Sequence, residues 1–111
     1  MLIDFHAMEE KIIPHMRGGE KEAGMRAYDD GLCKVMQGRL FPGATVGLHT
    51  HVTDSEVIYI LSGKGKVLYD DGCETISVGS CHYCPKGHSH SLINDSDEDL
   101  IFLAVVPQHG A

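Results

Sequence analysis

The stretch GLHTHVTDSE, residues 47–56, places two histidines one residue apart and a glutamate five residues after the second. Side chains at positions i and i+2 of a strand point to the same side, so His49 and His51 can direct two imidazoles at one point. Glu56 begins the next apolar segment after the short loop VTDS, which could bring its carboxylate back beside them. His90, in the later stretch PKGHSH, is a fourth candidate for the same cluster.

Three neutral imidazoles and one carboxylate form a ligand set for a divalent transition metal, such as Mn, Fe, Co, Ni or Zn. A six-coordinate ion held by four protein ligands would keep two positions for water or for a bidentate oxygen ligand. The alternative is that these histidines are separate surface or core residues. Two histidines one residue apart are by themselves a weak signal for a metal site.

Short apolar segments separated by turns surround these residues and indicate an all-β domain. The segment at 56–63, EVIYILSG, is rich in β-branched and aromatic residues, which favour strands. Residues 65–79 have the pattern of a hairpin in which Asp70, Asp71 and Gly72 supply the turn. Further strands are expected at 32–41, 80–85, 89–94 and 100–107. A strand about every ten residues is typical of a sandwich or a barrel.

Residues 1–30 carry weaker signals. The segment AMEEKII at 7–13 is compatible with one or two turns of helix, and RGGEKEAG at 17–24 has the composition of a polar loop. We therefore expect an N-terminal arm at 1–30, short and irregular or helical, that packs on a barrel formed by 31–107. Residues 108–111 are expected to form a tail.

Apolar residues occupy both faces of the strand expected at 56–63. Ile58 and Ile60 share the parity of Glu56, while Tyr59 and further apolar residues fill the other face. A sheet with one solvated face alternates apolar and polar residues, so this strand is predicted to be covered on both sides. One face would line the barrel, and the other, including Tyr59, would pack on a second layer or on a partner subunit. We therefore expect a homodimer.

Ten positions match two sequence motifs. The first runs Gly43, five residues, His49-x-His51, four residues, Glu56, six residues and Gly63, and the second runs Gly79, five residues, Pro85-x-Gly87, two residues, His90, three residues and Asn94. Both motifs resemble, without a spacing error, the two conserved motifs of the cupin superfamily. The resemblance implies a double-stranded β-helix, the jelly-roll or cupin barrel. It also implies that the metal ligands are His49, His51, Glu56 and His90.

The cupin fold supports unrelated reactions, so the resemblance does not select one. Similar small metal-binding cupins include dioxygenases, decarboxylases, isomerases and lyases, and we expect an enzyme that acts on a small oxygen-rich metabolite bound at the metal. The alternative is a metal-dependent protein that binds or senses a small ligand without turnover. A purely structural metal is less favoured, because four protein ligands leave positions open on a six-coordinate ion.

Polar and thiol side chains outside the ligand set carry weaker signals. His82 shares the parity of Cys84, and both correspond to inward, apolar positions in proteins with this motif. His82 could support a ligand or carry a proton, or it could be a hydrogen-bonded histidine of the core or of an interface. Cys81 and Cys84 would lie about 10 Å apart in a strand, too far for a disulfide. The phase of strand 32–41 is open, so either Gln37 or Arg39 could line the pocket.

The composition limits the classes of partner. A chain of 111 residues favours one domain, and its net charge of −7, from 9 basic and 16 acidic residues, disfavours nucleic acid and anionic membranes. A small anionic ligand stays compatible, because a bound divalent cation reverses the local field. No apolar run reaches membrane-spanning length, and the first residues lack the pattern of a secretory signal. We therefore expect a cytoplasmic protein.

Overall fold

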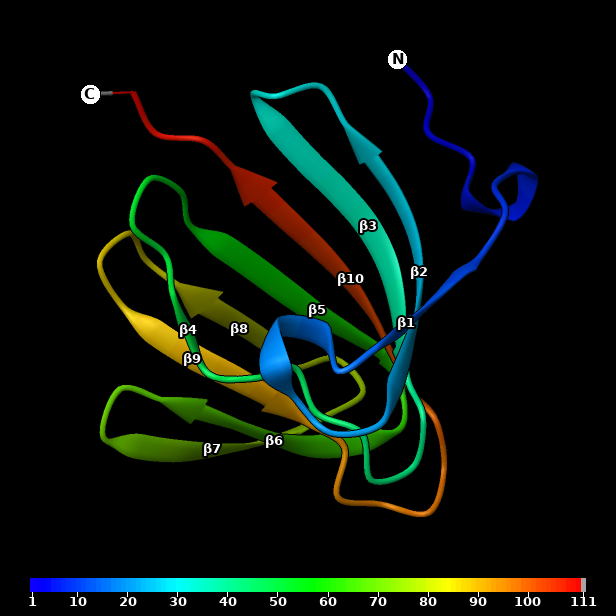
Figure 1. Cartoon of the computed structure of the whole chain (residues 1–111), viewed down its shortest axis with the longest axis vertical. Helices are drawn as coiled ribbons and strands as arrows, with labels where there is room; N and C mark the ends of the chain where they lie inside the picture. Colours follow the sequence, from blue (N-terminus) through cyan, green and yellow to red (C-terminus); the bar gives the residue numbers. More distant parts are fainter. Residues whose placement is uncertain (111) are drawn as a thin grey trace.

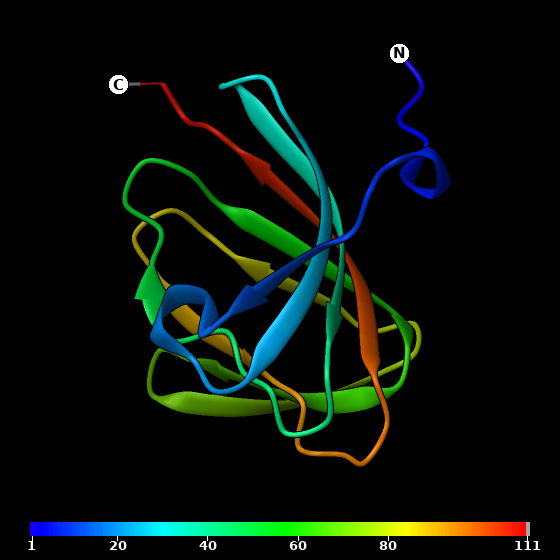
Figure 2. The same cartoon turned by 45° about the vertical axis from the view of Figure 1, so that its right-hand side comes forward.

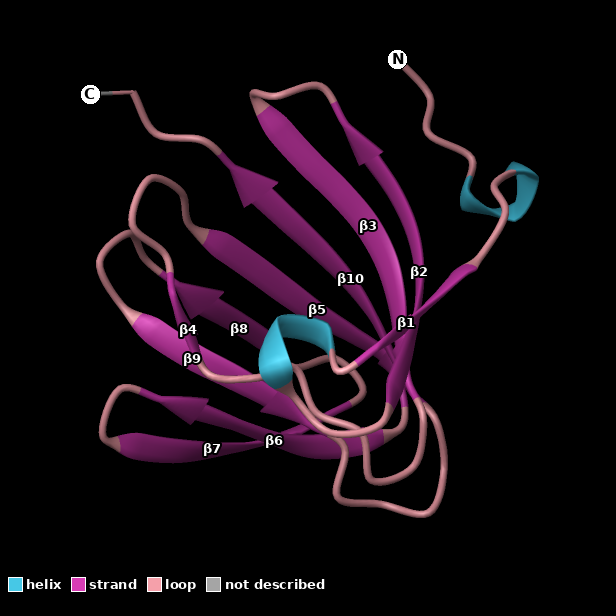
Figure 3. Ribbon diagram, in the orientation of Figure 1, coloured by secondary structure: helices cyan, strands magenta, loops and turns pink. Residues whose placement is uncertain are grey.

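The computed structural model describes residues 1–110, which form two antiparallel β-sheets (Figures 1 and 3). The strands are β1 (Lys11–Pro14), β2 (Glu22–Asp29), β3 (Cys33–Leu40), β4 (His49–Thr50), β5 (Glu56–Ser62), β6 (Lys64–Tyr69), β7 (Gly72–Ser77), β8 (Cys81–Cys84), β9 (Ser89–Ile93) and β10 (Leu100–Pro107). The only helical elements in this range are two 3-10 turns, η1 (Phe5–Ala7) and η2 (Met16–Gly18). The prediction of an all-β domain is confirmed.

The two sheets face each other and enclose the apolar core (Figures 1 and 2). The larger sheet has the strand order β1-β2-β3-β10-β5-β8, and the smaller one has the order β4-β9-β6-β7. Alternate residues of β10, from Leu100 through Phe102 to Val106, are buried, as expected for a strand with one inward face. From the smaller sheet, Val67 and Leu92 meet them. Each of these strands thus directs one row of alternate side chains into a shared apolar interior.

The N-terminal residues differ from the sequence-based prediction. Residues 7–13 do not form an α-helix: the 3-10 turn η1 ends at Ala7, and β1 begins at Lys11. A segment this short cannot offset the cost of helix nucleation, whereas Ile12 and Ile13 gain a strand partner in β2. The expected polar loop at 17–24 is also interrupted, because β2 begins at Glu22 and pairs along its length with β3. The separation of residues 1–30 from the barrel as a unit stays a prediction.

The structure also determines which side chains of β3 face the interior of the barrel. Met36, Gly38 and Leu40 are buried and face the interior. Gln37 and Arg39 therefore point to the outer face, where the Arg39 guanidinium pairs with Glu10 and Asp99. Neither residue lines the interior cavity described below.

Local turn chemistry accounts for the hairpin predicted at 65–79. Tyr69 and Gly72 are cross-strand partners, and Asp70 between them has a φ of 49°, a left-handed conformation that aspartate tolerates better than most residues.

A buried amide links segments at the opposite end of the barrel: Asn94 donates to the carbonyls of Leu40 and Glu98. Among residues 1–110, no helix is long and apolar enough to cross a membrane.

Candidate metal centre

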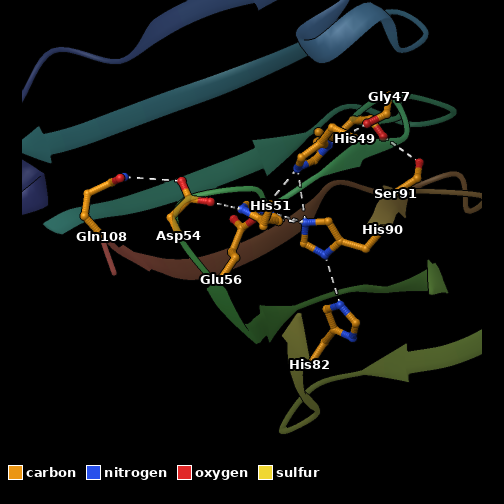
Figure 4. Close-up of polar contacts among 10 residues, drawn as sticks. Gly47, His49, His51, Asp54, Glu56, His82, His90, Ser91 and Gln108 are labelled. Carbon is orange, nitrogen blue, oxygen red and sulfur yellow. Dashed lines mark hydrogen bonds and ion pairs between the residues drawn. The ribbon is translucent and has the colours of Figure 1, made fainter. Parts of the chain in front are cut away.

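The four residues of the predicted ligand set come together in the barrel interior (Figure 4). His49 lies on β4 and is the cross-strand partner of His90 on β9. His51 follows β4 directly, and Glu56 is the first residue of β5 in the opposite sheet. One nitrogen or oxygen atom from each of the four lies within 4.8 Å of the others. These side chains are therefore placed as a group that could hold a metal ion.

The separations of these atoms fit neighbouring positions around a transition metal. The Nε2 atom of His90 lies 2.9 Å from that of His51 and 3.1 Å from that of His49. The Oε1 atom of Glu56 lies 3.0 Å from His90 Nε2 and 3.2 Å from His51 Nε2. Two ligands at right angles, each about 2.1 Å from an ion, are about 3.0 Å apart. The spacing thus matches the expected metal.

Hydrogen bonds to the far nitrogen of each ring orient the imidazoles. The Nδ1 atom of His49 lies 2.7 Å from the carbonyl oxygen of Gly47, which can only accept a hydrogen bond. The Nδ1 atom of His51 lies 2.6 Å from Oδ1 of Asp54, another acceptor. Both rings therefore carry their proton on Nδ1 when neutral, and both direct an Nε2 lone pair into the cluster.

His90 is oriented by a second histidine. Its Nδ1 atom lies 3.0 Å from Nε2 of His82, and the Nδ1 atom of His82 lies 2.7 Å from Oε1 of Glu74. The carboxylate of Glu74 accepts from His82 Nδ1, which leaves His82 Nε2 free to accept from His90 Nδ1. His90, like the other two ligand candidates, then presents a lone pair on Nε2.

This proton arrangement tests whether the residues fit a metal. When the three rings are neutral, their Nε2 lone pairs and the Glu56 carboxylate oxygen converge, and none of the four is a donor. Such a group is unfavourable in a buried site unless a cation lies between the acceptors. A divalent transition metal satisfies all four at once, whereas protons satisfy them only in part. These four residues therefore fit a site that could hold a divalent metal ion.

The pKa shifts of the same side chains follow from burial and hydrogen bonding. Burial alone would raise the pKa of Glu56, but its hydrogen bonds with His51 and His90 outweigh it and lower the pKa to about 2. The hydrogen bond to Glu56 raises the pKa of His51. Burial lowers the pKa values of His49 and His82, which favours their neutral forms. Glu56 is therefore ionised across the physiological range and ready to bind a cation.

The metal candidates line a cavity of ≈ 220 Å³. Much of its wall is apolar and includes the buried side chains of Met36 and Phe102. Two cationic side chains, Arg17 and Lys34, belong to the same lining. His82 does not, because it lies behind His90 on the side away from the cavity (Figure 4). The cavity therefore combines the candidate metal ligands, an apolar wall and positive charge.

Sequence reasoning missed several residues of this site, among them Asp54 and Arg17. Asp54 holds His51 and also accepts a hydrogen bond from Gln108 at 3.3 Å. Its position three residues after a histidine, in the loop before Glu56, was the available signal. Arg17 lies in η2, inside a segment predicted to be a loop, and reaches the cavity because η2 packs against Gly47. A Cβ at Gly47 would lie 2.0 Å from the carbonyl oxygen of Arg17, so this contact requires glycine.

The remaining polar candidates lie outside the cavity. Tyr59 is 42% exposed and faces away from the metal candidates, as predicted. His88 is part of the surface, where it pairs with Asp70. Cys81 is exposed and Cys84 is buried, and both are free thiols. Burial raises the pKa of Cys84 to about 11, so it is an unreactive thiol of the interior.

Comparison with known proteins identifies the family. Residues 37–106 match the family model described as a cupin domain, which covers more than half of the chain. The protein therefore belongs to the cupin family, and the fold expected from the two motifs is confirmed.

Two similar proteins come from Thermotoga maritima. An oxalate-binding protein is 39% identical over 101 residues, which cover 85% of this chain and 83% of that protein. A crystal structure of a predicted oxalate decarboxylase has a TM-score of 0.91 and 31% identity, covering 97% of this chain and 99% of the other. The polyketide cyclase RemF from Streptomyces resistomycificus has a TM-score of 0.79 at 23% identity, covering 96% and 78%, and shares the fold alone.

Proposed function

We propose that this cupin binds a divalent transition metal through His49, His51, Glu56 and His90, and that the metal binds a small oxygen-rich acid as the substrate of an enzyme. One observation carries the proposal: three imidazoles and a carboxylate converge in a largely buried site and, when the rings are neutral, offer four acceptors to a cation. When bound, the metal would polarise a carboxylate or carbonyl oxygen, or bind dioxygen if it is iron. Manganese, iron, cobalt, nickel and zinc all fit this donor set.

The cavity and the relatives support an anionic ligand. Arg17 and Lys34 add positive charge to a lining that already includes the metal site. The oxalate-binding protein and the predicted oxalate decarboxylase from Thermotoga maritima favour a dicarboxylate as the first ligand to test. Oxalate can place one oxygen of each carboxylate on the two positions that four protein ligands leave open on a six-coordinate ion. The cavity also has room for a somewhat larger acid.

A second candidate is metal-dependent binding without turnover. This candidate is favoured because Asp54, a carboxylate of the cavity lining, already accepts hydrogen bonds from His51 and Gln108. A general acid must be free to give up its proton to the reacting group, and Asp54 is held instead as an acceptor. The two candidates share the metal and the ligand and differ only in chemistry.

Titration calorimetry with oxalate tests the shared part of the proposal. Protein loaded with Mn²⁺ should bind oxalate, while the metal-free protein and acetate as a monocarboxylate control should give much weaker signals. Equal oxalate binding with and without metal would contradict the proposal. Measurement of formate and carbon dioxide from oxalate, with Mn²⁺ or Fe²⁺ bound, then separates an enzyme from a binding protein.

We also propose a homodimer formed through the outer face of the larger sheet. Tyr59 and Leu61 on β5 and Tyr83 on β8 are 42%, 41% and 55% exposed on neighbouring strands. Aromatic residues gathered in this way are typical of the centre of an interface. Light scattering should give a dimer mass that Tyr59→Asp reduces to the monomer and that the exposed control Thr75→Asp leaves unchanged. A monomer across the micromolar range would contradict this assembly.

A further inference from the structure

We propose that Glu74 is a positioning residue for the metal centre, acting through His82 on His90. This inference rests on the proposed function, in which His90 binds the metal through Nε2. It assigns a role to a carboxylate that lies on β7, outside the cupin motifs and outside the cavity lining. The side chain of Glu74 is 48% exposed, whereas that of His82 is 2% exposed. A surface residue would thus control a buried ligand.

The need for this control comes from the chemistry of His90. An imidazole that binds a metal through Nε2 must keep its proton on Nδ1, and that N–H requires an acceptor in a buried site. The structure supplies Nε2 of His82 at 3.0 Å. His82 can accept there only if its own proton is on Nδ1. The tautomer of His82 therefore decides whether His90 is a good ligand.

Glu74 selects that tautomer. Its Oε1 atom lies 2.7 Å from Nδ1 of His82, and an ionised carboxylate can only accept. With a donor in place of Glu74, the His82 proton would move to Nε2 and would face the N–H of His90. The two N–H groups would then oppose each other at the back of the metal ligand. The carboxylate prevents this arrangement because it can only accept a hydrogen bond from His82 Nδ1.

Packing holds the His82 ring in place for this contact. The ring stacks on His90, with centroids 5.2 Å apart and an interplanar angle of 26°. Tyr69 meets it edge to face, with centroids 5.4 Å apart. A ring packed against these two neighbours cannot turn freely. His82 therefore cannot easily exchange its two nitrogens by ring rotation. The hydrogen-bond partner of Nδ1 then decides which nitrogen carries the proton.

Two substitutions of Glu74 separate this role from a general structural one. Glu74→Gln keeps an acceptor oxygen for His82 Nδ1, whereas Glu74→Lys offers only donors. Asp71→Lys is the matched control: it makes the same change of charge at an exposed residue of the β6–β7 turn. Circular dichroism and thermal unfolding of each variant report whether the barrel is folded.

Zinc binding, measured by competition with a chromophoric chelator, is the first readout. We expect Glu74→Lys to lower zinc affinity about 10- to 100-fold, the range found for outer partners of metal-bound histidines. Glu74→Gln should stay within about threefold of the unmodified protein, and so should the Asp71→Lys control, because solvent and salt screen a surface charge. Equal losses in Glu74→Lys and Asp71→Lys would overturn the proposal.

The tautomer of His82 is the second readout. Long-range proton–nitrogen correlation spectra of the zinc-loaded protein should show His82 protonated on Nδ1, and the proton on Nε2 in Glu74→Lys. A His82 protonated on Nε2 in the unmodified protein would overturn the proposal while leaving the metal site intact. Failure of the unmodified protein to bind zinc, manganese or iron would instead refute the proposed function, so the two failures are distinguishable.

Discussion

The His82–Glu74 and His88–Asp70 pairs have the same chemistry and nearly the same length, 2.7 and 2.6 Å. His82 is buried and uses its second nitrogen to reach His90, whereas both side-chain hydrogen bonds of His88 use Nδ1. The side chain of His88 is 43% exposed, and the bond to it lowers the pKa of Asp70 without involving the metal candidates. A carboxylate–histidine pair therefore indicates a functional role only where the second nitrogen faces the site.

The largest effect is expected when the Glu56 carboxylate is removed from the interior cluster. Glu56→Ala removes one of four candidate ligands, and we expect zinc affinity to fall more than about 100-fold, beyond the range for outer partners. The barrel should stay folded, because Glu56 is not part of the apolar core. Elemental analysis and circular dichroism measure the two effects, with His88→Ala as the control. Stoichiometric metal in Glu56→Ala would refute the ligand assignment.

Acidification should weaken metal binding through the interior histidines. The hydrogen bond to Glu56 raises the pKa of His51, so below that pKa the metal must displace a proton from this ring. Zinc affinity should be constant above the pKa of His51 and fall about tenfold per pH unit below it. Glu56 does not contribute to this change, because its pKa is about 2. Zinc affinity that does not change between pH 8 and pH 5 would contradict the assignment of His51.

A smaller effect is expected for the carboxylate that orients His51. Asp54→Ala removes the acceptor at 2.6 Å from Nδ1, and we expect zinc affinity to fall about tenfold. Asp54→Asn keeps an acceptor oxygen and should lose less. Competition with a chelator measures both variants against Asp70→Ala. If Asp70→Ala lowered zinc affinity as much as Asp54→Ala, the proposed difference between the interior pair and the surface pair would be wrong.

The smallest effect is expected at the surface pair. Asp70→Asn and His88→Ala should leave zinc affinity unchanged, because the His88 side chain makes its hydrogen bonds to Asp70 and Tyr69 and not to a ligand candidate. The same titrations test this expectation. A drop comparable to that of Asp54→Ala would extend the positioning network to the surface and remove the contrast between the pairs.

Much of the barrel could be predicted because its strands carry local signals. β5 and β10 are apolar and β-branched along their length, and the β6–β7 turn has the residues that a tight turn requires. β1 and β2 could not be predicted in this way. β2 is a strand because it pairs with β3, and a pairing between distant segments leaves no local pattern in a polar sequence. The same holds for η2, which is held in place by Gly47.

The candidate site, like the fold, could be predicted from the sequence only in part. The ligand set His49, His51, Glu56 and His90 follows from residue types, spacing and the motif resemblance, and these side chains do converge. Asp54 and Glu74, which orient two of them, were not predicted. For Glu74 the reason is physical: its contact with His82 depends on how two sheets are placed against each other, because β7 and β8 belong to different sheets.

The sequence by itself determined the chemical types at the centre of this protein, the strand pattern around them and the family. Tertiary structure alone decided which side of β3 faces the interior, which cations reach the cavity and where each imidazole keeps its proton. The reason is that a residue type specifies what a group can donate or accept. Only its partner in space decides which of those options is used.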